Sequence, residues 1–271
     1  MMKPTLLLSA LLLSGSALAG NDCTGNDVWV FENDTNKFGG GTFGNCGAYP
    51  ADESLRVVTY TSWADGEMGQ RHLIWRVLLT KADKPDVVAS ATLNLWEGPN
   101  MVLREEVEEP LFFVDKANYP LNASTNAFAV RADLGPDSYC RDVSRDQFVT
   151  LFVRDGSQLK PVLKHLPLKQ SLVVEGSPCS RYDYSKTARG EGRLTLLDTV
   201  TNGYRDLKFT TTAVYESYDE LSQQQVDETD PGQWEASFKP ETRQFDTTLK
   251  FDGHRYPVEW QQLPSKEWWQ Q

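Results

Sequence analysis

The sequence predicts an all-β protein, mainly antiparallel, built from two β meanders or subdomains with at most one or two short helices. The pattern of apolar residues predicts this class. Apolar stretches are short, rich in Val, Thr, Phe, Tyr and Trp, and recur between Gly, Asn, Asp or Pro residues, as strands do between turns. The chain also has four cysteines, an even number that favours a disulfide-stabilised, exported fold.

The first segment, residues 1–19, is predicted to be a secretory signal peptide. Lys3 lies near its start, an apolar run covers 6–13, and Ala17 and Ala19 form a small-residue cleavage site. The apolar run is too short to span a bilayer, and no later run approaches the roughly 20 residues that a spanning helix needs. We therefore expect a periplasmic or secreted protein without a membrane span.

Residues 20–125 are expected to form the N-terminal β subdomain. The glycine-rich stretch 35–47 is predicted to be a loop, and 103–125, with an acidic cluster and two prolines, a connection that ends the subdomain. The strands expected at 71–81 and 87–96 flank the turn ADKPD, which predicts a hairpin. The expected strands are 28–34, 55–63, 71–81 and 87–96.

Residues 126–271 are expected to form the C-terminal β subdomain, or to continue the same domain. Its one predicted helix, 220–228, is short and polar. Stretches 150–162 and 248–258 resemble each other, which indicates either a duplicated hairpin or two uses of the Asp-Gly turn that hairpins favour. The expected strands are 127–134, 147–166, 171–176, 193–198, 206–218, 242–253 and 254–260.

The four cysteines allow three pairings in two disulfides. We favour Cys23 with Cys46 and Cys140 with Cys179, because each pair is close in sequence and closes a turn-rich loop. The cysteines lack the close spacing of zinc ligands.

The chain carries a formal net charge of −11. Such a surface repels nucleic acid and anionic lipid, and it suits a basic protein or a cationic small ligand as partner. The alternative is that the acidity serves only solubility.

One segment, LLDTVTNGYRDLKF, has the spacing of a calcium loop. Asp198, Asn202, Gly203 and Asp206 occupy positions one, five, six and nine of a nine-residue window. This window resembles the calcium loops of EF-hands, dockerins and FG-GAP repeats, and the resemblance implies Asp198, Asn202 and Asp206 as oxygen ligands. Val200 stands where those loops have a further donor. The alternative is a plain hairpin with Asn202-Gly203 as a type I′ turn. Apart from calcium at this loop, we expect no cofactor.

Catalytic motifs are weak throughout. The three histidines His72, His165 and His254 form no metal-binding or catalytic pattern, and the SxxK match at 157–160 lacks its companion motifs. The acidic run at 105–109 could supply paired carboxylates but has the character of a solvated loop.

These observations leave three hypotheses for function. The first is a non-catalytic binding protein, inhibitor or immunity-like, that recognises a basic protein of the cell envelope. The second is an envelope glycan or peptide hydrolase with carboxylates from distant strands, and the third is a calcium-stabilised structural or adhesion-like module. The eight tryptophans could serve the first hypothesis as exposed anchors, or simply fill a β core.

Overall fold

The computed structural model describes seven segments of the chain, and all further statements concern these segments. They are residues 23–38, 40–65, 71–94, 111–133, 143–176, 185–218 and 241–258. One α-helix, α1 (Gly25–Thr35), and a short 3-10 helix, η1 (Asn36–Phe38), precede eleven strands in the described chain. The predicted all-β class is confirmed.

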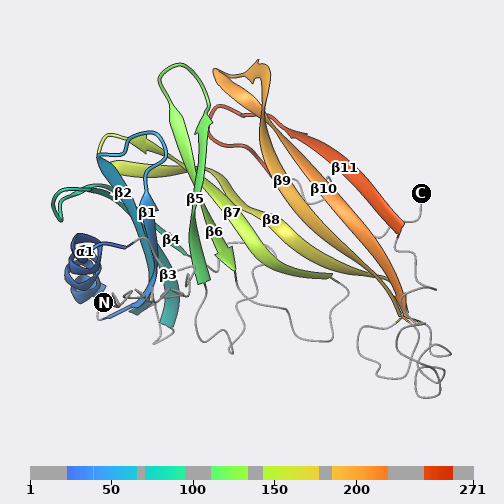
Figure 1. Cartoon of the computed structure of the whole chain (residues 1–271), viewed down its shortest axis with the longest axis horizontal. Helices are drawn as coiled ribbons and strands as arrows, with labels where there is room; N and C mark the ends of the chain where they lie inside the picture. The colour runs from blue at the N-terminus through green and yellow to red at the C-terminus, as the bar shows by residue number, and fades with distance from the viewer. Residues whose placement is uncertain are drawn as a thin grey trace, which may run out of the picture.

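The strands join in one sheet of eleven. Figure 1 shows them as long, twisted ribbons with α1 at the N-terminal end. Their bounds are β1 (Thr42–Ala48), β2 (Leu55–Asp65), β3 (Arg71–Lys81), β4 (Val87–Asn94), β5 (Leu111–Pro120), β6 (Asn126–Asp133), β7 (Val143–Asp155), β8 (Gln158–Gly176), β9 (Ser185–Thr201), β10 (Tyr204–Tyr218) and β11 (Glu241–Leu249).

Strand order follows two paths that meet at β8. The main path is β1-β2-β3-β4-β8-β7-β6-β5, and β9, β10 and β11 extend from β8 in sequence order. Pairing is antiparallel except between β4 and β8, which run parallel and meet at Ser90 and Gln158. The long strand β8 therefore belongs to both parts of the sheet.

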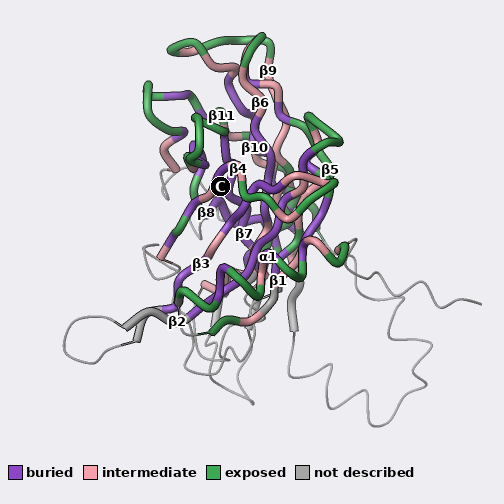
Figure 2. The backbone as a smooth tube through the Cα atoms, turned by 90° about the vertical axis from the view of Figure 1, so that its left-hand side faces the viewer, coloured by how far each residue is buried: buried purple, intermediate pink, exposed green. Residues whose placement is uncertain are grey.

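The sheet folds back on itself, so that its central strands are buried on both faces. On β6, Phe128 and Val130 belong to one apolar core with β2, β3 and β4, whereas Ala127 and Ala129 belong to a second core with β8, β10 and β11. Figure 2 shows the resulting buried stretches running through the middle strands. Runs such as AFAV and FVTLFV are apolar at consecutive positions because both of their faces are covered.

Trp75 on β3 is the centre of the first core. Its ring is fully buried, stacks on Phe112 at 5.2 Å between ring centroids, and meets Phe152 edge-on at 5.7 Å. The indole N–H donates to the hydroxyl of Thr59 at 2.6 Å, so the one polar atom of the ring is satisfied.

Strands β1 and β5, the ends of the main path, also approach each other. A Cβ on Gly44 would lie 2.8 Å from the ring of Phe112, and one on Gly47 would lie 3.2 Å from Val114. The glycines that predicted a loop at 35–47 instead give β1 the small profile that this close approach needs. That loop prediction was wrong.

Three other sequence predictions were wrong as well. Residues 28–34, expected as a strand, lie in α1. A capping box at Thr24 starts the helix there, and contacts with strands distant in sequence determine which of its faces is buried. The connection expected at 103–125 contains β5, and the strand expected at 254–260 is irregular over its described part, 254–258.

Several predictions fall outside the described chain or stay untested. The helix expected at 220–228, both cysteines of the second disulfide and the acidic run at 105–109 lie outside the described residues. The division near residue 125 stays a prediction; in the structure, β5 and β6 pair across it. No helix in the described segments is long and apolar enough to cross a membrane.

Candidate functional site

Helix α1 begins at a capping box. The Thr24 hydroxyl accepts a hydrogen bond from the backbone N–H of Asp27 at 3.4 Å, and the Asp27 carboxylate accepts one from the Thr24 backbone N–H at 2.7 Å. These reciprocal bonds satisfy donors that a helix start leaves free. The Thr24–Asp27 spacing is the local signal that favours a helix over the strand suggested by the run VWVF.

The helix docks on the sheet through its acidic residues. Asp27 and Asp34, seven positions apart, are buried on the face that meets β2 and β3. Arg56 on β2 donates its Nε to Asp27 Oδ2 at 2.8 Å, and Arg76 on β3 donates Nη2 to Asp34 Oδ2 at 2.8 Å. Two aspartate-arginine pairs, about two helical turns apart, thus hold α1 along its length.

The Asp34 carboxylate also binds residues of β2 and η1. Besides Arg76, it accepts hydrogen bonds from the Tyr60 hydroxyl at 2.7 Å and from the Lys37 ammonium at 3.0 Å. Burial alone would raise the pKa of Asp34, but the bonds from Tyr60, Arg76 and Lys37 outweigh it and hold the pKa below 3.8. Burial and the bond to Asp34 together raise the pKa of Tyr60, so the phenol stays protonated as a donor.

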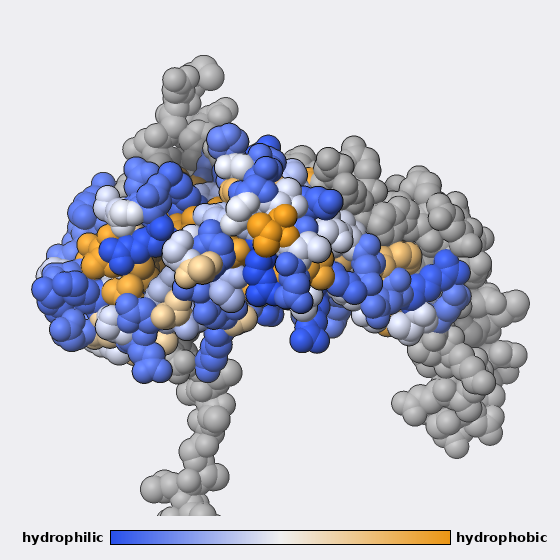
Figure 3. Space-filling model, turned by 90° about the horizontal axis from the view of Figure 1, so that it is seen from above, coloured by the Kyte–Doolittle hydropathy of each residue, from blue (hydrophilic) through white to orange (hydrophobic). Residues whose placement is uncertain are grey.

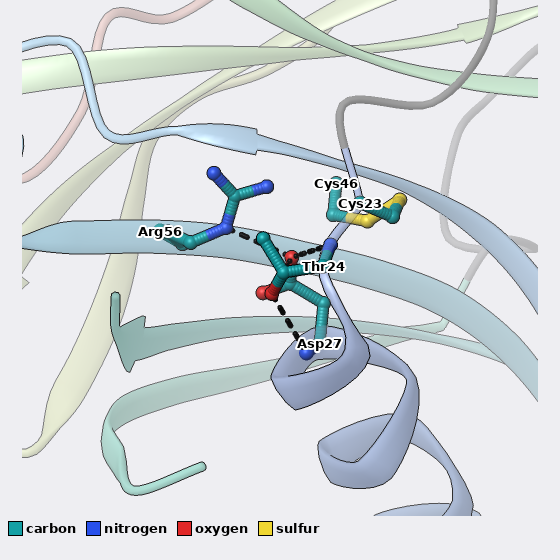
Figure 4. The surroundings of a disulfide bond; sticks show 5 residues. All are labelled: Cys23, Thr24, Asp27, Cys46 and Arg56. Atoms are coloured by element: carbon teal, nitrogen blue, oxygen red, sulfur yellow. Dashed lines mark hydrogen bonds and ion pairs between the residues drawn. A yellow bond between two sulfur atoms is a disulfide. The ribbon is translucent and has the colours of Figure 1, made fainter. Parts of the chain in front are cut away.

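A disulfide fastens the start of the helix. Cys23 bonds to Cys46 on β1, which confirms one of the two predicted pairings. Figure 4 shows this bridge beside Thr24, Asp27 and the guanidinium of Arg56. The apolar contacts under the helix come from Val30, which is buried, and from Phe31, which is half-buried and meets Tyr60 edge-on at 5.3 Å between ring centroids.

The outward face of α1 carries a tryptophan. Trp29 is 51 % exposed and Val28 is 41 % exposed, next to each other on the helix. An ordinary surface helix buries its apolar residues and exposes its acids. Helix α1 keeps this arrangement at Val30 and Glu32 but reverses it at Asp27 and Asp34, which are buried, and at Val28 and Trp29, which are exposed. Asn33 donates its side-chain N–H to the Trp29 carbonyl at 2.8 Å, which places an amide one turn beyond the indole.

The surface elsewhere is mainly hydrophilic. On the face seen in Figure 3, apolar residues form small patches separated by polar ones. Besides Trp29 and Val28, the large hydrophobic side chains exposed in the described chain are Val87, Phe113 and Val200, each on a different strand. Val28 and Trp29 are therefore the one pair of exposed large hydrophobic residues that shares an element in the described chain.

The candidate calcium loop is a β-hairpin. Asn202 and Gly203 have φ angles of 49° and 86°, and Thr201 pairs with Tyr204, as in a type I′ turn. The Asn202 side-chain amide donates to the Phe251 carbonyl at 2.8 Å, which ties the turn to the segment after β11. The hairpin alternative is thus the one that the backbone adopts.

The two aspartates of that loop have different surroundings. Asp198 is fully exposed and pairs with Arg205 at 2.9 Å, whereas Asp206 is buried and accepts a hydrogen bond from Thr199 at 2.7 Å. Asp206 Oδ1 is buried with no hydrogen-bond partner in the described chain. No group of three or more His, Cys, Asp or Glu side chains in the described segments is arranged to hold a metal ion.

The remaining sequence candidates are dispersed. Ser157 lies in the β7–β8 turn and Lys160 pairs with Asp155, so the SxxK match is part of a hairpin. His254 is exposed in the turn after β11, and its backbone N–H donates to Asp252 at 2.7 Å. His165 is buried in β8.

Comparison of the chain with protein-family models, with curated proteins and with solved structures found no match. Function therefore has to be argued from the residues described above. The sequence reading missed α1 as a site, although two signals were present: the Thr24–Asp27 capping pair, and two acids spaced seven residues apart.

Proposed function

We propose that this protein is an exported, non-catalytic binding protein whose contact surface for a basic envelope protein is centred on the outward face of α1. The observation that carries the proposal is the reversed helix. Two of its three acids, Asp27 and Asp34, face the sheet, whereas Trp29 is exposed. Tryptophan is the residue type most enriched at the energetic centres of protein interfaces.

The fastening of α1 supports a binding role. A contact residue on a helix held by a disulfide and two ion pairs loses little conformational freedom when a partner binds. Because Asp27 Oδ2 and Asp34 Oδ2 already pair with Arg56 and Arg76, these acids serve rigidity rather than attraction. The attraction to a basic partner comes from the net charge of −11, which speeds encounter and makes association salt-dependent.

The proposal can be tested by photo-crosslinking. A photoreactive amino acid replaces Trp29 in the exported protein, and a matched variant carries it at Thr212, an exposed position on β10. We expect one dominant adduct from position 29, with a partner of high isoelectric point, and none from position 212. Equal adducts from both positions, no adduct, or an acidic partner would contradict the proposal.

The identified partner then allows a binding measurement. Trp29→Ala should weaken affinity by about ten-fold to thirty-fold, since a central tryptophan contributes roughly 2 kcal/mol when truncated. Thr212→Ala should leave affinity unchanged, and affinity should fall as salt is raised.

A calcium-stabilised module is a second candidate, favoured by one observation. Asp206 Oδ1 is a buried oxygen without a partner in the described chain, as an ion ligand would be. Thermal unfolding with excess calcium and with a chelator tests it. A rise in Tm with calcium that is lost in Asp206→Asn would support the site, and identical Tm values would leave the hairpin as a purely structural element.

A further inference from the structure

His165 lies at an irregularity between β7 and β8. Val149 pairs with Leu166 and Leu151 pairs with Leu163, so two residues of β8, Lys164 and His165, stand opposite the single residue Thr150. This is the arrangement of a β-bulge. The φ angle of His165 is 50°, in the left-handed region that side chains other than glycine seldom adopt.

The bulge decides which way the side chains of β8 face. Leu163 and Leu166 both reach the core shared with β9–β11, although three positions separate them, and a regular strand would send them to opposite faces. The bulge restores the alternation that this core needs. Within the bulge, the His165 backbone N–H donates a hydrogen bond to the Thr150 hydroxyl at 3.2 Å.

The imidazole faces the other core. It is 5 % exposed and stacks near Trp75, with 6.3 Å between ring centroids and 27° between ring planes. Its Nε2 is buried without a hydrogen-bond partner in the described part of the chain. The ring is therefore held by packing against an aromatic cluster.

The surroundings of the ring contain no counter-charge among the described side chains that act on it. From β3 the ring meets Trp75, and on β8 its charged neighbour is Lys164, which is cationic and exposed. On β7, the Thr150 hydroxyl bonds to the backbone of His165. Burial, and to a lesser degree Lys164, lowers the pKa of His165 from 6.5 to about 4. The neutral ring is thus the form that fits the closed bulge.

We propose that His165 is an acid-operated switch, in which protonation of the buried ring opens the β7–β8 bulge and separates β8 from the core around Trp75. The charge has no partner inside, so the ring must reach water to be solvated. The hinge is already present, because the left-handed residue and its hydrogen bond to Thr150 both lie in the bulge. This inference does not depend on the proposed function.

The size of the effect follows from the two pKa values. An opened ring titrates near 6.5 and a closed ring near 4, so the opening equilibrium rises as pH falls between these values. The two pKa values differ by about 2.5, so full protonation raises the opening constant by about 300-fold. Above pH 6.5 the switch stays closed.

Two nuclear magnetic resonance measurements on the oxidised protein test the proposal. The first follows the ring protons of His165 against pH, assigned by their loss in His165→Asn; asparagine tolerates left-handed φ and cannot be protonated. The second follows hydrogen exchange of the Trp75 indole N–H, which is bonded to Thr59 in the closed state. His254→Gln, at an exposed turn, is the matched control.

We expect His165 to titrate well below 6.5, and the Trp75 indole exchange, corrected for its intrinsic pH dependence, to accelerate by tens to hundreds of fold between pH 6.5 and pH 4. His165→Asn should abolish the acceleration and His254→Gln should keep it. A His165 pKa near 6.5 would overturn the proposal. So would acceleration that persists in His165→Asn, and if that variant does not fold, a Trp75 indole exchange in the wild-type protein that does not accelerate between pH 6.5 and pH 4 overturns it.

Discussion

Replacing Gly192 with alanine tests the packing between β9 and the second core. A Cβ at position 192 would lie 2.3 Å from Cζ and 2.4 Å from Cε2 of Phe209, where ordinary contact begins at 3.4 Å. Phe209 is 1 % exposed on the neighbouring strand β10, so its ring has little room to move by the ångström that relief requires. Overpacking of this kind costs about 1 to 3 kcal/mol, more than the roughly 0.5 to 1 kcal/mol that alanine gains over glycine in an element interior.

We therefore expect Gly192→Ala to lower the free energy of unfolding by about 1 to 2 kcal/mol in urea denaturation, with an unchanged m-value. Gly190→Ala is the graded control two positions away on β9, since its Cβ would meet a flexible Thr211 methyl group at 3.0 Å, and its loss should be smaller.

The cause is identified by a double-mutant cycle. Phe209→Leu removes the ring atoms that obstruct position 192. The loss of unfolding free energy in the double variant should therefore be at least about 1 kcal/mol smaller than the sum of the losses in the two single variants. Strict additivity, or a Gly192→Ala protein as stable as the wild type, would refute the assignment of Gly192 to this contact.

Three further predictions concern the fastening of α1. Replacing both cysteines of the bridge to β1 with serine should cost about 3 kcal/mol, from the entropy of a 23-residue separation, as measured by urea denaturation against the oxidised wild type. Asp34→Ala should lower the free energy of unfolding by about 2 to 4 kcal/mol, because it leaves the Arg76 guanidinium without its carboxylate. In the wild type, the stabilisation by the Asp34 carboxylate is complete above pH 3.8 and is lost as the pH falls through its lower folded pKa. The free energy of unfolding should therefore depend less on pH below 3.8 in the variant than in the wild type. Trp29→Ala should change stability by less than about 0.5 kcal/mol, whereas Val30→Ala, its buried neighbour, should cost about 2 kcal/mol; a destabilised Trp29→Ala would show that the indole packs instead of being presented.

Most strands were predictable because their signal is local. The hairpin of β3 and β4 was expected at 71–81 and 87–96 and occurs at 71–81 and 87–94. The Asn202-Gly203 turn was likewise predictable, since both residues tolerate the positive φ that a type I′ turn requires. The order of strands was not predictable, because the junction of β8 with β4 rests on a single residue pair that no local pattern encodes.

Helix α1 shows why the candidate site escaped sequence reading. The alternation in VWVF imitates a half-buried strand, and periodicity rules assume that apolar residues face inward. In α1 the inward positions are filled by Asp27 and Asp34, whose charges are tolerable there only because Arg56 and Arg76 arrive from strands that are distant in sequence.

The same feature accounts for the disulfide. A helix that buries one fully apolar side chain gains little from burial, and ion pairs in such partly buried positions offset much of their own desolvation without adding a large surplus. A covalent link at the first residue before the cap removes most of the chain entropy that would otherwise release the helix. With its inward face held by two arginine ion pairs and its start held by the disulfide, α1 stays attached to the sheet while the Trp29 side chain remains 51 % exposed.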